Sequence, residues 1–188
     1  MNPSAWRTIA SEPLHKSPWL RLNRETVATP SRPNGVAWLV VRRPVAAVIA
    51  PRTPAGEYLL IRQERVPVRR ETWEFPAGQI EGDGSDDSIL ATAHRELGEE
   101  AGVRCSGELV SLGLFFSSVG FTDECCHLFL APEAVPASEL VAHDTNEAIH
   151  EVRAFSPQAL REAVAAGEII DANTLAVFAR LVARSLLE

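Results

Sequence analysis

Three glutamates and an arginine lie close together in Arg95–Val103, which reads Arg-Glu-Leu-Gly-Glu-Glu-Ala-Gly-Val. Read as a helix, at about 100° per residue, this stretch directs Glu96, Glu99 and Glu100 to one side. Like charges at this spacing repel one another, and the helix dipole disfavours anions near a C-terminus. Two arrangements accommodate them: a fully solvated face, or a face that binds a hard divalent cation through oxygen ligands.

The residues around these carboxylates predict the helix that would position them. An apolar face, roughly a third of a turn away from the glutamates, would consist of Leu90, Ala93, Leu97 and Ala101. Ser85 or Asp86 could cap the N-terminus, where Asp87 is also favourable. Gly102 is the residue type that ends a helix in the left-handed conformation. We therefore predict a helix that ends at about Ala101.

Short apolar runs in the rest of the chain predict strands, at 19–29, 36–41, 45–50, 58–63, 73–75, 109–116, 125–131 and 149–155. Helices are expected from Ser156 to about Gly167, and again after Asp171 or Asn173, where an apolar face recurs. Residues 1–16 have little pattern and are expected to be irregular. This mixture predicts an α+β fold, or helices around a mixed sheet, with a small β-meander ahead of the main domain.

The composition excludes several classes of protein. The chain has 188 residues, a net charge of −7 and three cysteines without disulfide or zinc spacing. A net negative charge argues against broad binding to nucleic acid. No run approaches the roughly 20 apolar residues that span a bilayer, and the N-terminus lacks the pattern of a signal peptide. We expect a cytoplasmic protein that binds neither nucleic acid nor membrane.

The glutamate-rich stretch resembles the C-terminal half of the signature of the Nudix hydrolases, Gly-x5-Glu-x7-Arg-Glu-apolar-x-Glu-Glu-x-Gly-apolar. Glu74–Gly78 resembles the approach to that signature. There are two departures: Asp87 replaces the first family glutamate, and the loop between Gly78 and Arg95 is three residues longer. The role of the first family carboxylate therefore falls to Asp87, to Glu81 or to neither.

Further segments are similar to the ADP-ribose pyrophosphatase branch of this family: LLIRQERVP (59–67), GFTDECCHLFLA (120–131), NEAIHEVRAFS (146–156) and IIDANTLAVFARL (169–181). The resemblance implies a Nudix-type α/β/α sandwich with a mixed central sheet over residues 44–188. It also implies that the antiparallel β-meander, residues 1–43, is shared between the subunits of a homodimer.

The resemblance also implies a metal site. Its ligands would be Glu96, Glu99, Glu100 and the backbone carbonyl of Ala77, holding Mg²⁺, with Mn²⁺ as an alternative. By spacing alone, Arg95 could form a surface ion pair with Glu99 worth about 0.3–0.5 kcal/mol. The family match implies instead that it positions a ligand carboxylate.

The remaining site residues are assigned by position in the family. Glu147 matches the general base best, Glu151 is the second candidate, and an ordinary exposed glutamate is the alternative for Glu147. Arg65, and less directly Arg62, would contact phosphate, since guanidinium suits that task. Glu74 and Glu124 would contact the nucleoside or ribose. Trp38 and Trp73 could stack on adenine, but core packing is the simpler interpretation.

These residues imply Mg²⁺-dependent hydrolysis of a nucleoside diphosphate sugar, with ADP-ribose yielding AMP and ribose 5-phosphate. One alternative is a Nudix module that binds a nucleotide sugar without hydrolysing it. Another is a hydrolase of a different sugar nucleotide or of a modified nucleotide.

Overall fold

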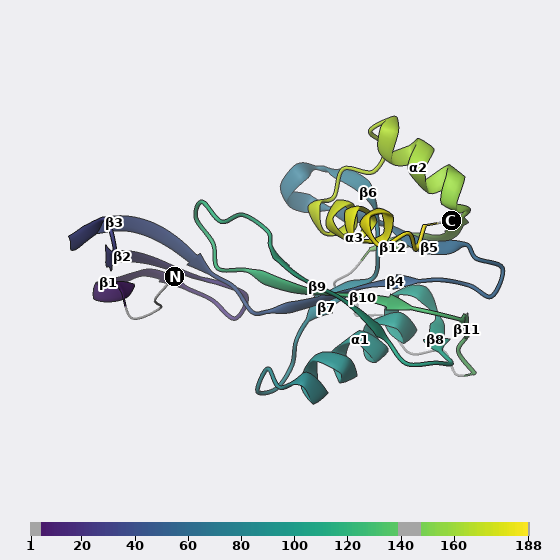
Figure 1. Ribbon diagram of the computed structural model, residues 1–188, viewed down its shortest axis with the longest axis horizontal. Coiled ribbons are helices and arrows are strands. Elements are labelled where there is room, and N and C mark those ends of the chain that lie inside the picture. The colour runs from purple at the N-terminus through teal and green to yellow at the C-terminus, as the bar shows by residue number, and fades with distance from the viewer. Residues whose placement is uncertain (1–4, 139–147, 188) are drawn as a thin grey trace. The chain divides into compact units, whose positions relative to one another are not determined.

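The computed structural model describes residues 5–138 and 148–187 (Figure 1). The chain divides into two compact units. The first consists of Met1–Pro44 and Phe116–Cys125, and the second of Val45–Phe115 and Cys126–Glu188. A loop from the middle of the sequence thus belongs to the N-terminal unit.

The first unit is built on a three-stranded antiparallel sheet in the order β1 (Arg7–Lys16), β2 (Arg21–Thr29) and β3 (Arg32–Arg42). The expectation that residues 1–16 are irregular is wrong, because most of them form β1. Every side chain of β1 is exposed. Because neither face of the strand is buried, apolar and polar residues do not alternate along it, and the sequence lacks the period of two that indicates a strand.

Charged contacts hold the loop 116–125 to this sheet. Nη2 of Arg42 lies 2.7 Å from Oε2 of the buried Glu25, and its Nη1 lies 2.7 Å from Oδ2 of Asp123. The indole Nε1 of Trp38 donates to the Gly120 carbonyl at 2.7 Å. Trp38 is 51% exposed, so the core placement expected for it is wrong. It lies on a strand whose two faces both carry exposed residues.

The second unit contains a mixed four-stranded sheet in the order β7 (Ala77–Gln79), β4 (Ala46–Pro51), β10 (Cys125–Ala131) and β9 (Val110–Phe116). β4 runs parallel to β10 and antiparallel to β7. A second sheet has the order β12 (Ile149–Phe155), β5 (Tyr58–Arg65) and β6 (Arg70–Glu74). A short pair joins β8 (Val103–Cys105) to β11 (Ala134–Pro136), and the turn η2 (Val66–Val68) follows β5.

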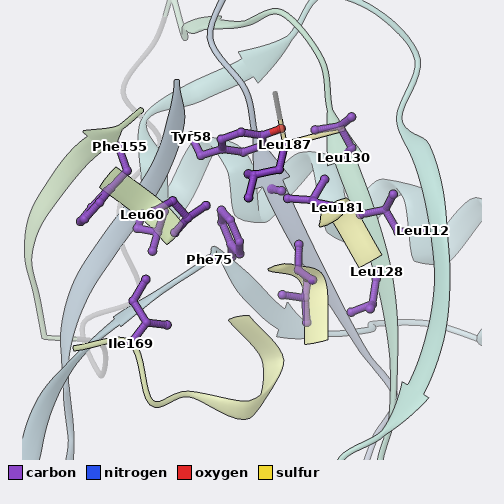
Figure 2. Close-up of a cluster of buried hydrophobic side chains, with 14 of the residues drawn as sticks. Tyr58, Leu60, Phe75, Leu112, Leu128, Leu130, Phe155, Ile169, Leu181 and Leu187 are labelled. Carbon is purple, nitrogen blue, oxygen red and sulfur yellow. The ribbon is translucent and has the colours of Figure 1, made fainter. Parts of the chain in front are cut away.

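Helices cover both sides of these sheets. Figure 1 shows α1 (Asp86–Ala101) on one side and α2 (Pro157–Ala165) and α3 (Ala172–Ala183) on the other. Successive residues of β4 alternate between the two cores, because strand side chains point alternately to opposite faces. Val48 and Ala50 join the cluster of Figure 2, and Ala47 and Ile49 pack with α1. The predicted α/β/α sandwich with a mixed sheet is confirmed.

The predicted termini of α1 and the predicted start of α3 are also confirmed. The Ser85 side chain caps α1 by accepting from the Ser88 amide, and Gly102 ends it with φ of 64°. Asp171 caps α3. None of the described helices is long and apolar enough to cross a membrane.

The faces of α1 differ from the prediction. Leu90 is 37% exposed, and Ile89 is buried in its place. Glu96 and Glu100 are buried beside Ala93 and Leu97 rather than on a separate face. The helix is therefore turned so that two of its carboxylates point into the protein.

Candidate functional site

The buried carboxylates of α1 lie against β7. Oε2 of Glu100 accepts a hydrogen bond from the Ala77 amide at 2.7 Å. An ideal Cβ at Gly78 would lie only 1.6 Å from Oε1 of Glu96. Only glycine therefore leaves room for the Glu96 carboxylate at this point of the strand. The structure thus brings together Ala77, Glu96 and Glu100, three of the residues expected to hold a metal.

Arg95 holds two of the glutamates. Its Nη2 donates to Oε1 of Glu96 at 2.6 Å, and its Nη1 pairs with Oε2 of Glu99. Burial lowers the pKa of Arg95, but the charges of Glu96 and Glu99 more than offset this and raise it. The predicted contact between Arg95 and Glu99 is present. Arg95 thus offsets the repulsion among carboxylates that the sequence led us to expect.

The side chains of this site suit a hard cation. Across residues 5–138 and 148–187, no three His, Cys, Asp or Glu side chains form a preassembled metal cluster. Magnesium is commonly held by only one or two carboxylates together with substrate phosphates. Glu96 and Glu100, buried beside the Ala77 backbone, supply oxygen donors of that kind. Glu99 lies one turn from Arg95 on the same helix.

A second cluster surrounds Glu74, whose side chain is 3% exposed. Arg65 donates to it twice, from Nε at 2.8 Å and from Nη2 at 2.6 Å. Gln63 donates at 3.3 Å, and the Thr72 hydroxyl also contacts the carboxylate. The pKa of Arg65 is raised, mainly by its hydrogen bond to Glu74 and further by the charges of Asp171 and Glu100. Glu74 thus orients the guanidinium of Arg65.

Arg62 lies on the opposite face of β5 from Arg65, because a separation of three residues reverses the side of a strand. It pairs with Glu71 and lies 5.9 Å from the Trp73 ring. Trp73 packs against the core, as expected. Glu151, in β12, lies 2.7 Å from Arg153 and 4.0 Å from Arg62. The structure therefore separates Arg62 and Glu151 from the Arg65 cluster.

The other predicted residues lie elsewhere. Glu124 belongs to the first unit, where Arg43 lies 2.8 Å from it and the Ser117 hydroxyl donates to it at 2.6 Å. Glu147 lies outside the described residues. Asp87 is exposed in the first turn of α1, and the exposed Glu81 lies 3.8 Å from Arg95.

Sequence reasoning missed Gln63, Thr72 and the electrostatic role of Asp171. Burial raises the pKa of Asp171, and the nearby charge of Glu74 raises it further. The alternation of β5 and β6 could have placed Gln63 and Thr72 beside Arg65 and Glu74. For Asp171 the only signal was its suitability as a helix cap.

A depression of about 410 Å³ opens beside Arg65. It is lined by Glu64, Arg65, Val66, Arg69, Arg70 and Glu71. Three of these six residues are arginines and two are glutamates, so the depression is lined by both basic and acidic residues.

Comparisons with known proteins bear on the family and the fold of this chain. The sequence profile of the NUDIX domain matches residues 41–178. An ADP-ribose pyrophosphatase of Bacillus subtilis (strain 168) is 32% identical over 170 residues, which cover 89% of this chain and 88% of that protein. A methanol dehydrogenase activator of Bacillus methanolicus is 28% identical over 155 residues, or 82% of this chain and 81% of that protein. A crystal structure of an ADP compounds hydrolase has the same fold, with a TM-score of 0.76, 19% identity and coverage of 97% and 94%.

Proposed function

Because the chain belongs to the Nudix family and is a Nudix hydrolase, we propose that it cleaves the pyrophosphate bond of a nucleoside diphosphate sugar, with Mg²⁺ as cofactor. The proposed substrate is ADP-ribose, and the products are AMP and ribose 5-phosphate. The 32% identical ADP-ribose pyrophosphatase supports this choice. The cysteine usage, three residues without disulfide spacing, supports a reducing, cytoplasmic setting.

The observation that carries the proposal is the contact of α1 with β7. Two buried carboxylates, Glu96 and Glu100, lie at Gly78 and at the Ala77 amide. A buried anion is costly unless it is paired, hydrogen-bonded or coordinated to a metal. A divalent cation bound there would offset charge on the phosphates and lower the pKa of a bound water. The protein's own part is to hold the carboxylates in place, through Arg95 and the backbone of β7.

Two further groups complete the proposed chemistry. Arg65 would bind a phosphate oxygen, since it is oriented by Glu74 and lines the depression. Glu147 would accept the proton of the attacking water. The partners of Glu151, namely Arg153 and Arg62, favour Glu147 for this role over Glu151. As water attacks one phosphorus, the other phosphate leaves with the bridging oxygen.

The first test is a panel of nucleoside diphosphate sugars and dinucleotides assayed with Mg²⁺, for the wild type and for Glu100→Gln. We expect ADP-ribose to give the highest kcat/KM and Glu100→Gln to lower it by about 100-fold or more, because even groups that only support metal ligands are worth about 10–100-fold. Glu168→Gln, an exposed change after α2, is the control and should match the wild type. If the protein binds these compounds but hydrolyses none of them, the result refutes the proposed hydrolysis and favours a module that only binds nucleotide sugars. Full activity of Glu100→Gln would refute the metal assignment.

The second test concerns the base. Glu147→Gln should lower kcat far more than it changes KM, because the proton acceptor acts in the transition state. The same measurement on Glu151→Gln is the control, and it should show a small effect. The reverse pattern would move the role to Glu151.

A further inference from the structure

The first turn of α3 holds a buried chain of hydrogen bonds. Oδ2 of Asp171 accepts from both the amide and the hydroxyl of Thr174, each at 2.8 Å. Thr174 is completely buried. The hydrogen bond from the Thr174 amide is the one that a helix N-cap ordinarily accepts, whereas the hydrogen bond from the Thr174 hydroxyl is additional. It orients the Thr174 hydroxyl, because a hydroxyl has one proton to donate and that proton goes to Asp171.

The oriented hydroxyl reaches back to the start of the candidate site. With its proton directed at Asp171, Oγ1 of Thr174 is left to accept, and the Phe75 amide donates to it at 3.0 Å. Phe75 follows β6 directly and lies two residues before Ala77. Its ring is fully buried in the cluster of Figure 2. The contact therefore fixes the backbone at the point where the chain leaves one sheet and enters the other.

The three residues of this crossing are each held by a different element. Thr174 of α3 accepts from the Phe75 amide, and the Ile49 amide of β4 donates to the Pro76 carbonyl at 2.9 Å. Glu100 of α1 accepts from the Ala77 amide at 2.7 Å. Proline has no amide proton, so every backbone donor of the crossing is used. Of the three anchors, only Glu100 belongs to the proposed metal site.

We propose that Thr174, oriented by Asp171, is a positioning residue for the metal site: its hydroxyl fixes the Phe75–Ala77 crossing and so places the Ala77 backbone against Glu100 and Glu96. The inference rests on the proposed function in so far as that site binds a cation. It assigns to α3, which lies on the other side of the sheet from α1, a part in the geometry of the site. Thr174 contacts neither metal nor substrate in this role.

Thr174→Val removes the hydroxyl at nearly constant volume, and Thr174→Ser retains it. The binding of Mn²⁺ alone is measured by calorimetry, without substrate, and amide exchange at Phe75 and Ala77 is measured by NMR in metal-free protein. We expect Thr174→Val to exchange faster at Phe75 and Ala77 and to bind Mn²⁺ about tenfold more weakly. Its kcat should fall more than its KM rises. Thr174→Ser, which keeps the hydroxyl, should bind Mn²⁺ with nearly the affinity of the wild type.

A purely structural role is tested by Ser156→Ala, which removes the cap of α2 without touching the crossing. This control should lower the melting temperature but leave Mn²⁺ affinity unchanged. If Thr174→Val fails to fold, Mn²⁺ binding is compared between Thr174→Ser, which keeps the hydroxyl, and Asp171→Ala, which removes the group that orients it. Mn²⁺ binding at wild-type strength by a folded variant without the hydroxyl contact overturns the inference. Wild-type protein that binds Mn²⁺ but hydrolyses nothing refutes the proposed function alone. Wild-type protein that hydrolyses a nucleoside diphosphate sugar but binds no Mn²⁺ without it overturns the inference alone.

Discussion

Gly78 shows how a single residue determines whether the candidate site can form. Its space is occupied by the Glu96 side chain, whose Oε1, Cδ and Cγ would lie 1.6, 2.2 and 2.9 Å from an added Cβ. Because most of the Glu96 side chain conflicts with a methyl group, a rotation of its end alone cannot resolve the clash. A buried carboxylate therefore depends on the absence of one carbon atom.

Gly78→Ala should thus displace Glu96 from β7. We expect kcat/KM to fall by about 100-fold, and stability to fall by about 1–3 kcal/mol, the usual cost of forcing extra volume into a packed interior. Activity with Mg²⁺ and urea unfolding measure the two effects. Gly107→Ala is a matched control, since its Cβ would meet only the Pro132 ring, at 3.9 Å. Equal activity in Gly78→Ala and Gly107→Ala would show that the site does not depend on the space at Gly78.

At the scale of elements, the sequence predicted those helices and strands whose ends or faces are marked by particular residue types. The helix α1 was predicted because single residues mark its two ends. Ser85 accepts a hydrogen bond at the N-terminus, and Gly102 adopts the left-handed conformation at the C-terminus. The strand β1 was missed because its side chains are all exposed, so no period of two marks it. The burial of Glu96 and Glu100 was not predicted, because helical spacing does not state which of two adjacent faces turns inward.

In the candidate site, too, residues close in sequence were predicted, and contacts between distant segments were not. Helical spacing grouped the acidic residues of α1, which are close in sequence, and the resemblance implied their role as metal ligands. The bond between Phe75 and Thr174 joins positions 99 residues apart, and no pattern within either segment points to the other. The pairing of Arg65 with Glu74 depends on the register of β5 against β6, which aligns Ile61 with Glu74 and Arg65 with Arg70. Contacts of this kind are set by topology rather than by local sequence.

The cap of α3 makes a prediction about pH. Burial raises the pKa of Asp171 above 3.8, so this carboxyl binds its proton more tightly in the folded protein than in the unfolded chain. At low pH the carboxyl is protonated in both the folded and the unfolded state, and the burial costs nothing. As the pH rises through the ordinary value, the unfolded chain releases its proton first, and the wild type loses stability until the folded pKa is passed.

Asp171→Asn keeps a good helix cap and removes this titration. The stability of Asp171→Asn relative to the wild type should therefore be higher at about pH 7 than at about pH 3.5, as measured by urea unfolding at each pH. Ser156→Ala, an uncharged cap change in α2, should differ from the wild type by the same amount at both. A relative stability of Asp171→Asn that falls with rising pH would mean that folding lowers the pKa of Asp171 instead of raising it.

At the scale of the whole molecule, the first unit has more apolar surface than its small sheet covers. Among the described residues, its exposed large apolar residues are Trp6, Ile9, Leu14, Trp19, Trp38, Leu39, Phe116, Val119 and Phe121. A small sheet needs a buried hydrophobic face or packing against another element to be stable by itself, and exposed apolar patches commonly mark interfaces. We propose that this surface is buried in a homodimer, which covers in the assembly what the single chain leaves exposed.

Leu14→Glu places a charge in that surface, on β1, where Leu14 is 41% exposed in the single chain. If the surface is a dimer interface, burying an unpaired carboxylate costs enough to dissociate it, because an isolated charge loses its hydration. Sedimentation velocity should then show a dimer for the wild type and a monomer for Leu14→Glu. Thr8→Glu is the matched control, a polar and exposed position of the same strand, and it should remain dimeric. A wild type that sediments as a monomer would remove the proposed interface, and a dimer that survives Leu14→Glu would move it away from this face of β1.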